Sequence, residues 1–399
     1  MTKKMTPEVA TWIVLFVTGA VAAGSKTPDW LVTRVTTPVT AVADNKGKDL
    51  VLSNGLIRRT FRLGPNAATI AYDNLMTGDS ILRGVKPEAI VEINGRTFNV
   101  GGLLGQVDYA YLRPEWVDSF TADPNALQFA GYEVGRTEAR LAWNRKRYSE
   151  DLPWPPPGAS LTLRFEPPAG QLPGVTVCVC YEMYEGIPLL AKWLEIRNDG
   201  PESIRLNTFI NEILAAVEYE SLVGEPTHWE LPNIHIESDY AFGGDNPEMA
   251  NKTIHWAPDP QYATQVNYLC KTPVMLECKP PLGPDVVIEP GQAFQSFRTF
   301  ELVHDSTERE RRGLAVRKMY RTLAPWVTEN PILMHVRSAD PKSVRLAVDQ
   351  CAEVGFEMVI MTFGSGFDLE NTDPAYMDQV KERSEERRVG KECTIQCRS

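Results

Sequence analysis

The stretch that decides the fold lies near the C-terminus, at residues 331–369: PILMHVRSADPKSVRLAVDQCAEVGFEMVIMTFGSGFDL. Its first apolar run predicts a short strand from Ile332 to Val336. A second run, Phe356 to Met361, lacks polar alternation, which is typical of parallel strands that are covered on both faces. The stretch therefore predicts a pair of buried, parallel strands.

A helix is predicted between these strands. Asp340 is a capping side chain, Pro341 suits the first helical position, and Gly355 suits the left-handed residue that ends a helix. A second helix is predicted after Asp373 and Pro374. Strand, helix, strand and helix with short links indicate a parallel β/α unit. Two strands cannot bury both faces of a sheet, so we expect more sheet than residues 330–382 supply.

The end of the chain changes character at Arg383, where the sequence becomes RSEERRVGKEC. This string resembles a sequencing-library adapter translated as coding sequence. We interpret residues 383–399 as an adapter-derived tail and residues 330–382 as the truncated start of a β/α domain. A genuine charged, solvated tail is the alternative.

Composition bounds the possible partners. The chain has 399 residues, 43% of them hydrophobic, and a net charge of −11. Outside the suspect tail there is no basic block, so nucleic acid is not an expected partner, since binding it needs clustered positive charge.

The N-terminus resembles a secretory signal over residues 1–23. Lys3 and Lys4 supply positive charge, Trp12 to Ala23 is an apolar run, and Ala20-Val21-Ala22 fits a small-residue cleavage site. We expect a secreted or periplasmic protein, with residues 24–44 as a linker and no membrane span after cleavage. An N-terminal anchor or a misassigned start is the alternative.

Cysteine use predicts no metal site, since no Cys or His spacing is typical of zinc, and we expect no cofactor. Cys178 and Cys180 lie two apart on one predicted strand and are interpreted as small buried hydrophobes. Cys270 and Cys278 flank KTPVMLE and could cross-link adjacent strands; the sequence leaves this open.

Residues 45–305 read almost entirely as strands. In VTVCVCYEMYEG the residues from Val175 to Met183 alternate with period two, which predicts one core-facing side. Asn94-Gly95 predicts a hairpin. At least ten strands predict a mainly β protein with a large antiparallel sandwich. A connecting helix is predicted over 306–329, with Asp305 and Glu308 as a capping box.

Several phrases resemble the retaining α-galactosidase group of glycoside hydrolases. They are SNGLIRRTF (53–61), YEMYEGIPLLAKWLEIRNDGPESIRLN (181–207), EPGQAFQSF (289–297), the helix before Pro325, and CAEVGFEMVIMTFG (351–364). The resemblance implies a galactose mutarotase-like β-supersandwich, a connecting helix, and a TIM barrel that is truncated early here. It also implies an oligo- or polysaccharide partner.

One departure bears on the substrate. The family's second barrel strand ends in two adjacent aspartates followed by Gly-Trp, whereas Thr362, Phe363, Gly364 and Ser365 stand at those positions. The resemblance therefore does not predict galactose specificity. Retaining glycosidases need two carboxyl groups, and the family's pair belongs to later strands, so no catalytic residue is assigned and this chain is expected to be inactive.

The expected substrate-binding residues follow the two strands, because the active sites of β/α barrels lie at the C-terminal ends of their strands. They are His335, Arg337, Thr362, Phe363, Asp368 and Glu370.

Two other classes of function stay open. One is a non-catalytic carbohydrate-binding or structural sandwich, for which an aromatic platform could be drawn from Trp116, Trp143, Trp154, Trp229 and Trp256, although core packing also explains tryptophans in a β domain. The other is a different reaction on the same scaffold, with His228, His235 and His255 as candidates.

Overall fold

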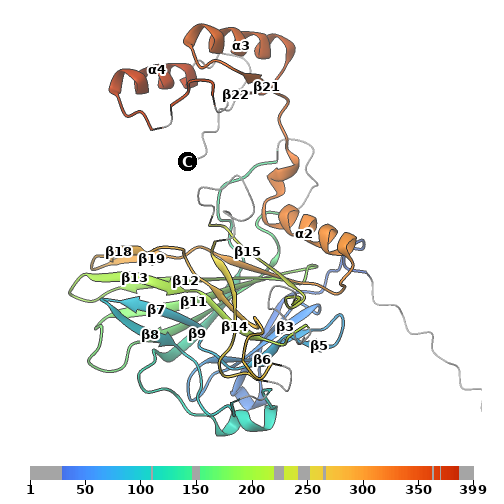
Figure 1. The fold of residues 1–399 in the computed structure, drawn as a ribbon, viewed down its shortest axis with the longest axis vertical. Helices are drawn as coiled ribbons and strands as arrows, with labels where there is room; N and C mark the ends of the chain where they lie inside the picture. The colour runs from blue at the N-terminus through green and yellow to red at the C-terminus, as the bar shows by residue number, and fades with distance from the viewer. Residues whose placement is uncertain are drawn as a thin grey trace, which may run out of the picture.

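The computed structural model describes residues 29–108, 111–145, 153–219, 229–240, 252–263, 267–361, 364–368 and 370–385. The expected signal at 1–23 and residues 386–399 of the suspect tail lie outside these ranges. Figure 1 shows a body of stacked sheets, the helix α2 beside it, and a small β/α segment beyond that helix.

Four antiparallel sheets form the body. The first, in spatial order, contains β1 (Thr40–Asp44), β2 (Asp49–Ser53), β3 (Ile57–Arg62), β4 (Ala68–Asn74) and β5 (Asp79–Ser80). The largest contains β15 (Ile234–Ser238), β20 (Thr299–Val303), β12 (Leu189–Asn198), β11 (Val175–Tyr184), β10 (Gly158–Glu166) and β9 (Gln128–Arg136), with β19 (Gln292–Gln295) also paired to β12.

Two four-stranded sheets complete the body. One runs β18 (Pro284–Ile288), β13 (Ile204–Ile210), β7 (Ala89–Ile93), β8 (Arg96–Val100). The other runs β16 (Ile254–Ala257), β17 (Met275–Cys278), β14 (Glu212–Ala216), β6 (Leu82–Gly84). Within the described part of 29–303, the helices are two 3-10 turns, Asn45–Gly47 and Pro114–Ser119. The predicted mainly β, antiparallel supersandwich is confirmed.

The core confirms the period-two prediction. Val175, Val177, Val179, Tyr181 and Met183 are all buried in one cluster with residues of the other sheets. The predicted hairpin is also present: β7 and β8 pair across Asn94-Gly95, whose φ angles are 53° and 73°. Positive φ at both positions is what a two-residue turn of type I′ requires.

The sheet begins inside the segment expected to be a linker. Thr40–Asp44 forms β1 and pairs with β2. Farther upstream, Trp30 is buried under the connecting helix, beside Met319 and Leu323. The body of the protein therefore includes chain that composition alone assigned to a linker.

The connecting helix is shorter than predicted, and its capping box is wrong. The helix α2 spans Arg309–Leu323 and is followed by a 3-10 turn, Pro325–Thr328. Its N-cap, Glu308, makes no side-chain cap hydrogen bond. Asp305 instead accepts hydrogen bonds from Trp30 Nε1, at 2.8 Å, and from Arg311. These partners hold the Asp305 carboxylate away from the helix N-terminus.

The β/α unit forms as predicted. Its elements are β21 (Leu333–Val336), α3 (Pro341–Val354), β22 (Met358–Met361) and α4 (Pro374–Glu385), and the two strands are parallel. Asp340 Oδ1 accepts a hydrogen bond from Ser343 N at 3.0 Å, and Gly355 closes α3 at φ 83°. Both capping predictions are confirmed.

The cysteines of the sandwich are free thiols of low reactivity. Cys270 and Cys278, left open as a bridged pair, are free thiols. Burial raises the pKa of Cys178 to about 11 and that of Cys180 to about 12. Thiols with such pKa values stay protonated and unreactive near neutral pH, as expected of small buried hydrophobes.

Candidate functional site

The predicted substrate-binding residues belong to the edge of the sheet where β21 and β22 end, which we call the rim. His335 pairs in register with Ile360, and Val336 with Met361, so the residues after both strands meet at one edge of the sheet. Ala339 N donates to Ser365 O at 2.7 Å, which ties the two strand-end loops together. His335 and Arg337 are both exposed at this edge. The structure thus brings the first-strand candidates next to the loop of the second.

The second-strand candidates are less well placed for joint action. Thr362 and Phe363 lie outside the described residues. Asp368 and Glu370 are exposed, and Asp368 Oδ1 accepts a hydrogen bond from Glu370 N at 3.0 Å. The Asp368 carboxylate therefore stabilises its own turn, as aspartates commonly do in loops. These two carboxylates sit on one turn and do not face each other across an open space.

The tryptophan candidates do not form one platform. Trp229 is buried, and Trp256 packs against the main core. Trp143 and Trp154 instead pack together with Trp326, a residue that the sequence did not single out, at ring-centroid distances of 5.3–6.4 Å. These tilted and edge-on contacts are typical of aromatic packing. The cluster joins the loop after β9 to the turn after α2.

The histidine candidates also separate. His228 lies outside the described residues, and His255 is half-buried on β16. His235 on β15 pairs with Glu237 Oε2 at 3.1 Å, and Tyr320 of α2 donates to the same carboxylate. Burial alone would raise the pKa of Glu237, but the hydrogen bonds from His235 and Tyr320 outweigh it and lower the pKa. This group fastens α2 to the edge of the large sheet.

A buried ionic cluster that sequence reasoning missed lies inside the sandwich. It comprises Arg59, Glu88, Lys192, Glu212 and Glu301, and each side chain is at most 1% exposed. Glu212 accepts from Arg59 Nη1 at 2.9 Å and from Lys192 Nζ at 3.0 Å. Arg59 Nη1 also lies 3.4 Å from Glu301 Oε1. With no exposed member, the cluster is a structural device.

Two of the three carboxyl groups of this cluster, Glu212 and Glu301, have pKa shifts in opposite directions. Burial would raise the pKa of Glu212, yet Arg59 and Lys192 outweigh it and lower the pKa to about 2. For Glu301, burial and the neighbouring Glu212 charge raise the pKa well above the usual range. Glu301 is therefore held neutral, and Glu212 is the charged carboxylate that lies closest to both Arg59 and Lys192.

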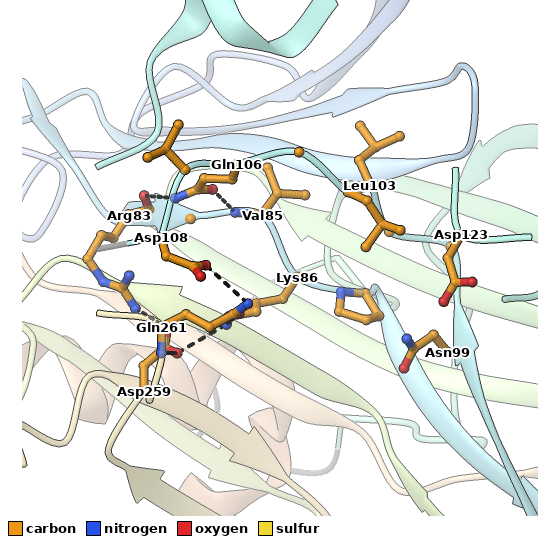
Figure 2. A pocket seen from close by; sticks show the side chains of 17 residues that line it. Arg83, Val85, Lys86, Asn99, Leu103, Gln106, Asp108, Asp123, Asp259 and Gln261 are labelled. Atoms are coloured by element: carbon orange, nitrogen blue, oxygen red, sulfur yellow. Dashed lines mark hydrogen bonds and ion pairs between the residues drawn. The ribbon is translucent and has the colours of Figure 1, made fainter. Parts of the chain in front are cut away.

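A polar pocket lies at the link from β6, in one four-stranded sheet, to β7, in the other, and we call it the seam pocket. Arg83 is the middle residue of β6, Lys86 lies on the link from β6 to β7, and the loop after β8 brings Gln106 and Asp108 over them. Asp259 and Gln261 come from the loop after β16. Figure 2 shows Lys86 near the middle, with Asp108 and Gln261 on one side and Asn99 and Asp123 on the other.

The floor of the seam pocket is a buried ion pair. Arg83 and Asp259 pair with each other, and their side chains are at most 2% exposed. The Arg83 guanidinium also lies 4.1 Å from the ring centroid of Tyr262. Lys86 Nζ reaches Asp259 Oδ1 at 3.2 Å and Gln261 Oε1 at 2.8 Å. Since Arg83 and Asp259 neutralise each other, Lys86 supplies the cationic donor at the surface.

A second pocket lies near the end of β20, lined by Tyr111, Glu218, Asn233 and His304 among others. Tyr262 donates a hydrogen bond to Glu218, and its hydroxyl lies 3.2 Å from that of Tyr111. Burial and the nearby His235 lower the pKa of His304 to about 4, so its imidazole is neutral near pH 7. The lining of this pocket mixes these polar groups with apolar side chains such as Ile81, Leu112 and Val303.

Comparisons with known proteins give only distant likenesses. No protein-family model and no curated protein match the chain. Among solved structures, the α-galactosidase AgaB of family GH36 from Geobacillus stearothermophilus is similar, with a TM-score of 0.46 and 13% identity over 86% of this chain and 55% of that one. The galactosidase domain of the α-galactosidase–sucrose kinase AgaSK gives 0.43 and 12% over 86% and 56%.

A variant of the GH36 α-galactosidase AgaA from the same Geobacillus species, solved with 1-deoxygalactonojirimycin, gives a TM-score of 0.44 at 12% identity, over 84% of this chain and 55% of that one. The chain thus spans about half the length of these structures. Superpositions this loose carry no argument about function.

Proposed function

We propose that this chain is part of an exported carbohydrate-active protein related to the retaining α-galactosidase-like glycoside hydrolases. The observation that carries the proposal is the order of its parts: a large antiparallel sandwich, the docked helix α2, and then the parallel unit β21–α3–β22–α4. The sequence phrases that resemble this group span all three parts. Residues 330–382 then form the start of a β/α barrel.

Unburied apolar surface on the β/α unit supports the incomplete barrel. Ile332 is 52% exposed, Leu346 57% and Val354 63%. No residue of β22 is buried, although a parallel strand normally has helices on both faces of its sheet. Additional strands and helices of a barrel would cover these side chains.

The chemistry assigned to the strand ends is substrate binding. Arg337 and His335 supply donors for sugar hydroxyls at the edge of the pair, and Asp368 and Glu370 supply acceptors. A retaining glycosidase also needs two carboxyl groups about 5 Å apart across the scissile bond. The described strand ends provide no such facing pair, so we propose that the 399-residue chain alone does not turn over substrate.

Hydrolysis assays test the proposal directly. The 399-residue chain and a version extended with the uninterrupted gene are compared on a panel of aryl α- and β-glycosides. We expect turnover only in the extended protein. Measurable hydrolysis by the 399-residue chain, surviving repurification, would place the catalytic site elsewhere and contradict the proposed barrel.

Arg337 provides a finer test within the extended protein. Arg337→Ala should raise KM about tenfold, because a hydrogen bond from a charged group contributes roughly 1.5–3 kcal/mol. Arg345→Ala is the matched control, since Arg345 lies on α3 and pairs with Glu382 at 2.6 Å, away from the strand ends. Equal effects of the two variants would remove Arg337 from the site.

A non-catalytic, carbohydrate-binding sandwich is the second candidate. The seam pocket favours it, because it is polar and built entirely from sandwich residues. Catalytic inactivity of the extended protein together with retained saccharide binding would select this alternative.

Export is part of the same proposal and rests on Lys3, Lys4, the apolar run Trp12 to Ala23, and Ala20-Val21-Ala22. Among the described residues, no helix is long and apolar enough to cross a membrane. N-terminal sequencing of protein recovered outside the cytoplasm should show a start near Ala23. A cytoplasmic protein that retains Met1 would refute export.

A further inference from the structure

We propose that the seam pocket is a binding site for a small, neutral, hydroxyl-rich ligand, the ring of a single sugar residue, held by Lys86, Asp108 and Gln261. This site lies in the sandwich and is separate from the strand ends of the β/α unit. The chemistry of the pocket indicates a polyol; the choice of a saccharide among polyols rests on the proposed function.

Donors and acceptors in the seam pocket are fixed in orientation before any ligand arrives. The Gln261 oxygen accepts from Lys86 Nζ at 2.8 Å, while its amide nitrogen donates to Asp108 Oδ1 at 3.5 Å. The Gln261 backbone nitrogen in turn donates to Asp259 Oδ1 at 3.0 Å. A chain of alternating donors and acceptors therefore runs along one wall, as Figure 2 shows. Such preorganisation lowers the entropy lost on binding.

A hydroxyl group suits this wall because it both donates and accepts hydrogen bonds. An ammonium group has three donors, and the structure assigns two of those on Lys86, to Asp259 and Gln261. A carboxylate accepts several hydrogen bonds, and Asp108, which is exposed, receives one from Gln261. Neighbouring hydroxyls on a ring can therefore bridge Lys86 and Asp108.

Charge balance disfavours an anionic ligand. Arg83 and Asp259 neutralise each other, which leaves Lys86 against Asp108 and Asp123 around the opening. An anion would face the two carboxylates of Asp108 and Asp123, against the single ammonium of Lys86. No group of three or more metal-ligating side chains with a suitable arrangement exists among the described residues. A neutral ligand avoids the repulsion that an anion would meet.

Size and shape favour one ring over a chain of sugars. The pocket has a volume of about 240 Å³, below the roughly 300–1,000 Å³ of sites for drug-sized ligands. Its other side combines Pro87 and Leu103, beside Gly102, with the polar Asn99 and Asp123. A Cβ at Gly102, whose φ is 92°, would lie 3.1 Å from Pro87 Cα. The close approach of these segments leaves no room for a side chain at position 102, and Pro87 and Leu103 supply apolar groups for the C–H face of a ring.

Saturation-transfer NMR on the complete 399-residue chain tests the proposal, with methyl α- and β-hexopyranosides as probes at millimolar concentration. We expect saturation transfer from the wild-type protein to the probe, and we expect one probe to reduce the signal of the other by competition. Asp108→Ala and Gln261→Ala should each raise the Kd at least fivefold, and Lys86→Met at least tenfold. Asp108 and Gln261 are exposed, so their replacement leaves the core intact.

Asp199→Ala is the matched control, because Asp199 is an exposed carboxylate that pairs with Arg197 at 2.9 Å outside the pocket. Thermal unfolding of every variant confirms that the fold is kept. A Kd that is unchanged in Asp108→Ala and Gln261→Ala would overturn the seam pocket as the site. Absence of binding by the wild-type protein would overturn it as well. Neither result touches the proposed function, which hydrolysis by the extended protein decides.

Discussion

The sandwich and the β/α segment are built from equally apolar strands, yet they bury them differently. In the sandwich, Leu50, Leu52, Val177 and Leu194 are at most 1% exposed. In the strand pair, only Val336 is buried, at 8%, and Leu333 is 41% exposed. The contrast shows that strand formation and strand burial are separate problems. Local signals are enough for the first, whereas the second needs further elements to pack against.

The two regions should therefore differ most in independent stability. A fragment of residues 29–328 keeps both sides of the α2 interface, since Trp30 packs with Met319, and we expect it to unfold in one cooperative transition. Residues 330–382 alone should be unfolded or aggregated, because their exposed apolar surface has nothing to cover it. Circular dichroism with thermal melting, together with proton NMR dispersion, distinguishes these outcomes.

A fragment of residues 45–328 serves as the internal control. It lacks β1 and Trp30, so it should melt at a lower temperature than 29–328 while remaining folded. A well-dispersed, cooperatively folded spectrum from residues 330–382 would remove the distinction between the two regions.

Breaking the buried ionic cluster is the next largest perturbation, and it is confined to the sandwich. Glu212→Gln removes the carboxylate that lies closest to both Arg59 and Lys192 inside the core and leaves them only Glu88, at 3.8 Å from each. Removing one partner of a buried pair typically costs about 3–5 kcal/mol. We expect a loss of that size in the free energy of unfolding at pH 7, measured by urea denaturation of the 29–328 fragment.

The pH dependence gives this prediction its sign. Because the pKa of Glu212 is lowered, its carboxylate stabilises the fold above its ordinary pKa near 4.5, and this contribution is lost as the pH falls toward about 2. The difference between wild type and Glu212→Gln should therefore be full at pH 7 and shrink below pH 4.5. A difference that grows on acidification would contradict the assigned charge.

Glu301→Gln is the matched comparison in the same cluster. The raised pKa of Glu301 means that its folded form binds a proton more tightly than its unfolded form, which costs stability as the pH rises above about 4.5. An amide of the same shape removes this cost. We expect the variant to equal or exceed wild-type stability at pH 7, with an advantage that narrows toward pH 4. Destabilisation as large as that of Glu212→Gln would show that Glu301 is ionised.

Sequence reasoning performed best where the determinants are local. The caps Asp340 and Gly355 and both strands of the β/α unit were predicted to within two residues, because each signal lies inside the element that it specifies. The box of Asp305 and Glu308 failed for the opposite reason. Asp305 bonds to Trp30, which is 275 residues away, and no local pattern announces such a partner.

The buried ionic cluster and the seam pocket both depend on contacts between residues that are far apart in the sequence. Arg59 lies 153 residues from Glu212 and 242 from Glu301, and Lys86 lies 175 from Gln261. Each of these residues, taken singly, looks like an ordinary surface charge or amide. Strand positions could be predicted from alternation. The order of the strands within the four sheets could not, and that order brings these side chains into contact. The rim was predictable only because parallel strands place their ends together.

The smallest change in the free energy of unfolding is expected for a substitution on the exposed face of the β/α segment. Leu346 lies on α3 with 57% of its surface exposed, so Leu346→Glu should change the free energy of unfolding of the 399-residue chain by no more than about 0.5 kcal/mol. Ala347→Glu is the control on the same helix, since Ala347 is buried against the strand pair and should tolerate no charge. In a protein extended with the uninterrupted gene, a covered Leu346 would make the first substitution costly too. Equal tolerance of Leu346→Glu in both lengths, measured by differential scanning calorimetry, would show that no further element packs on this face.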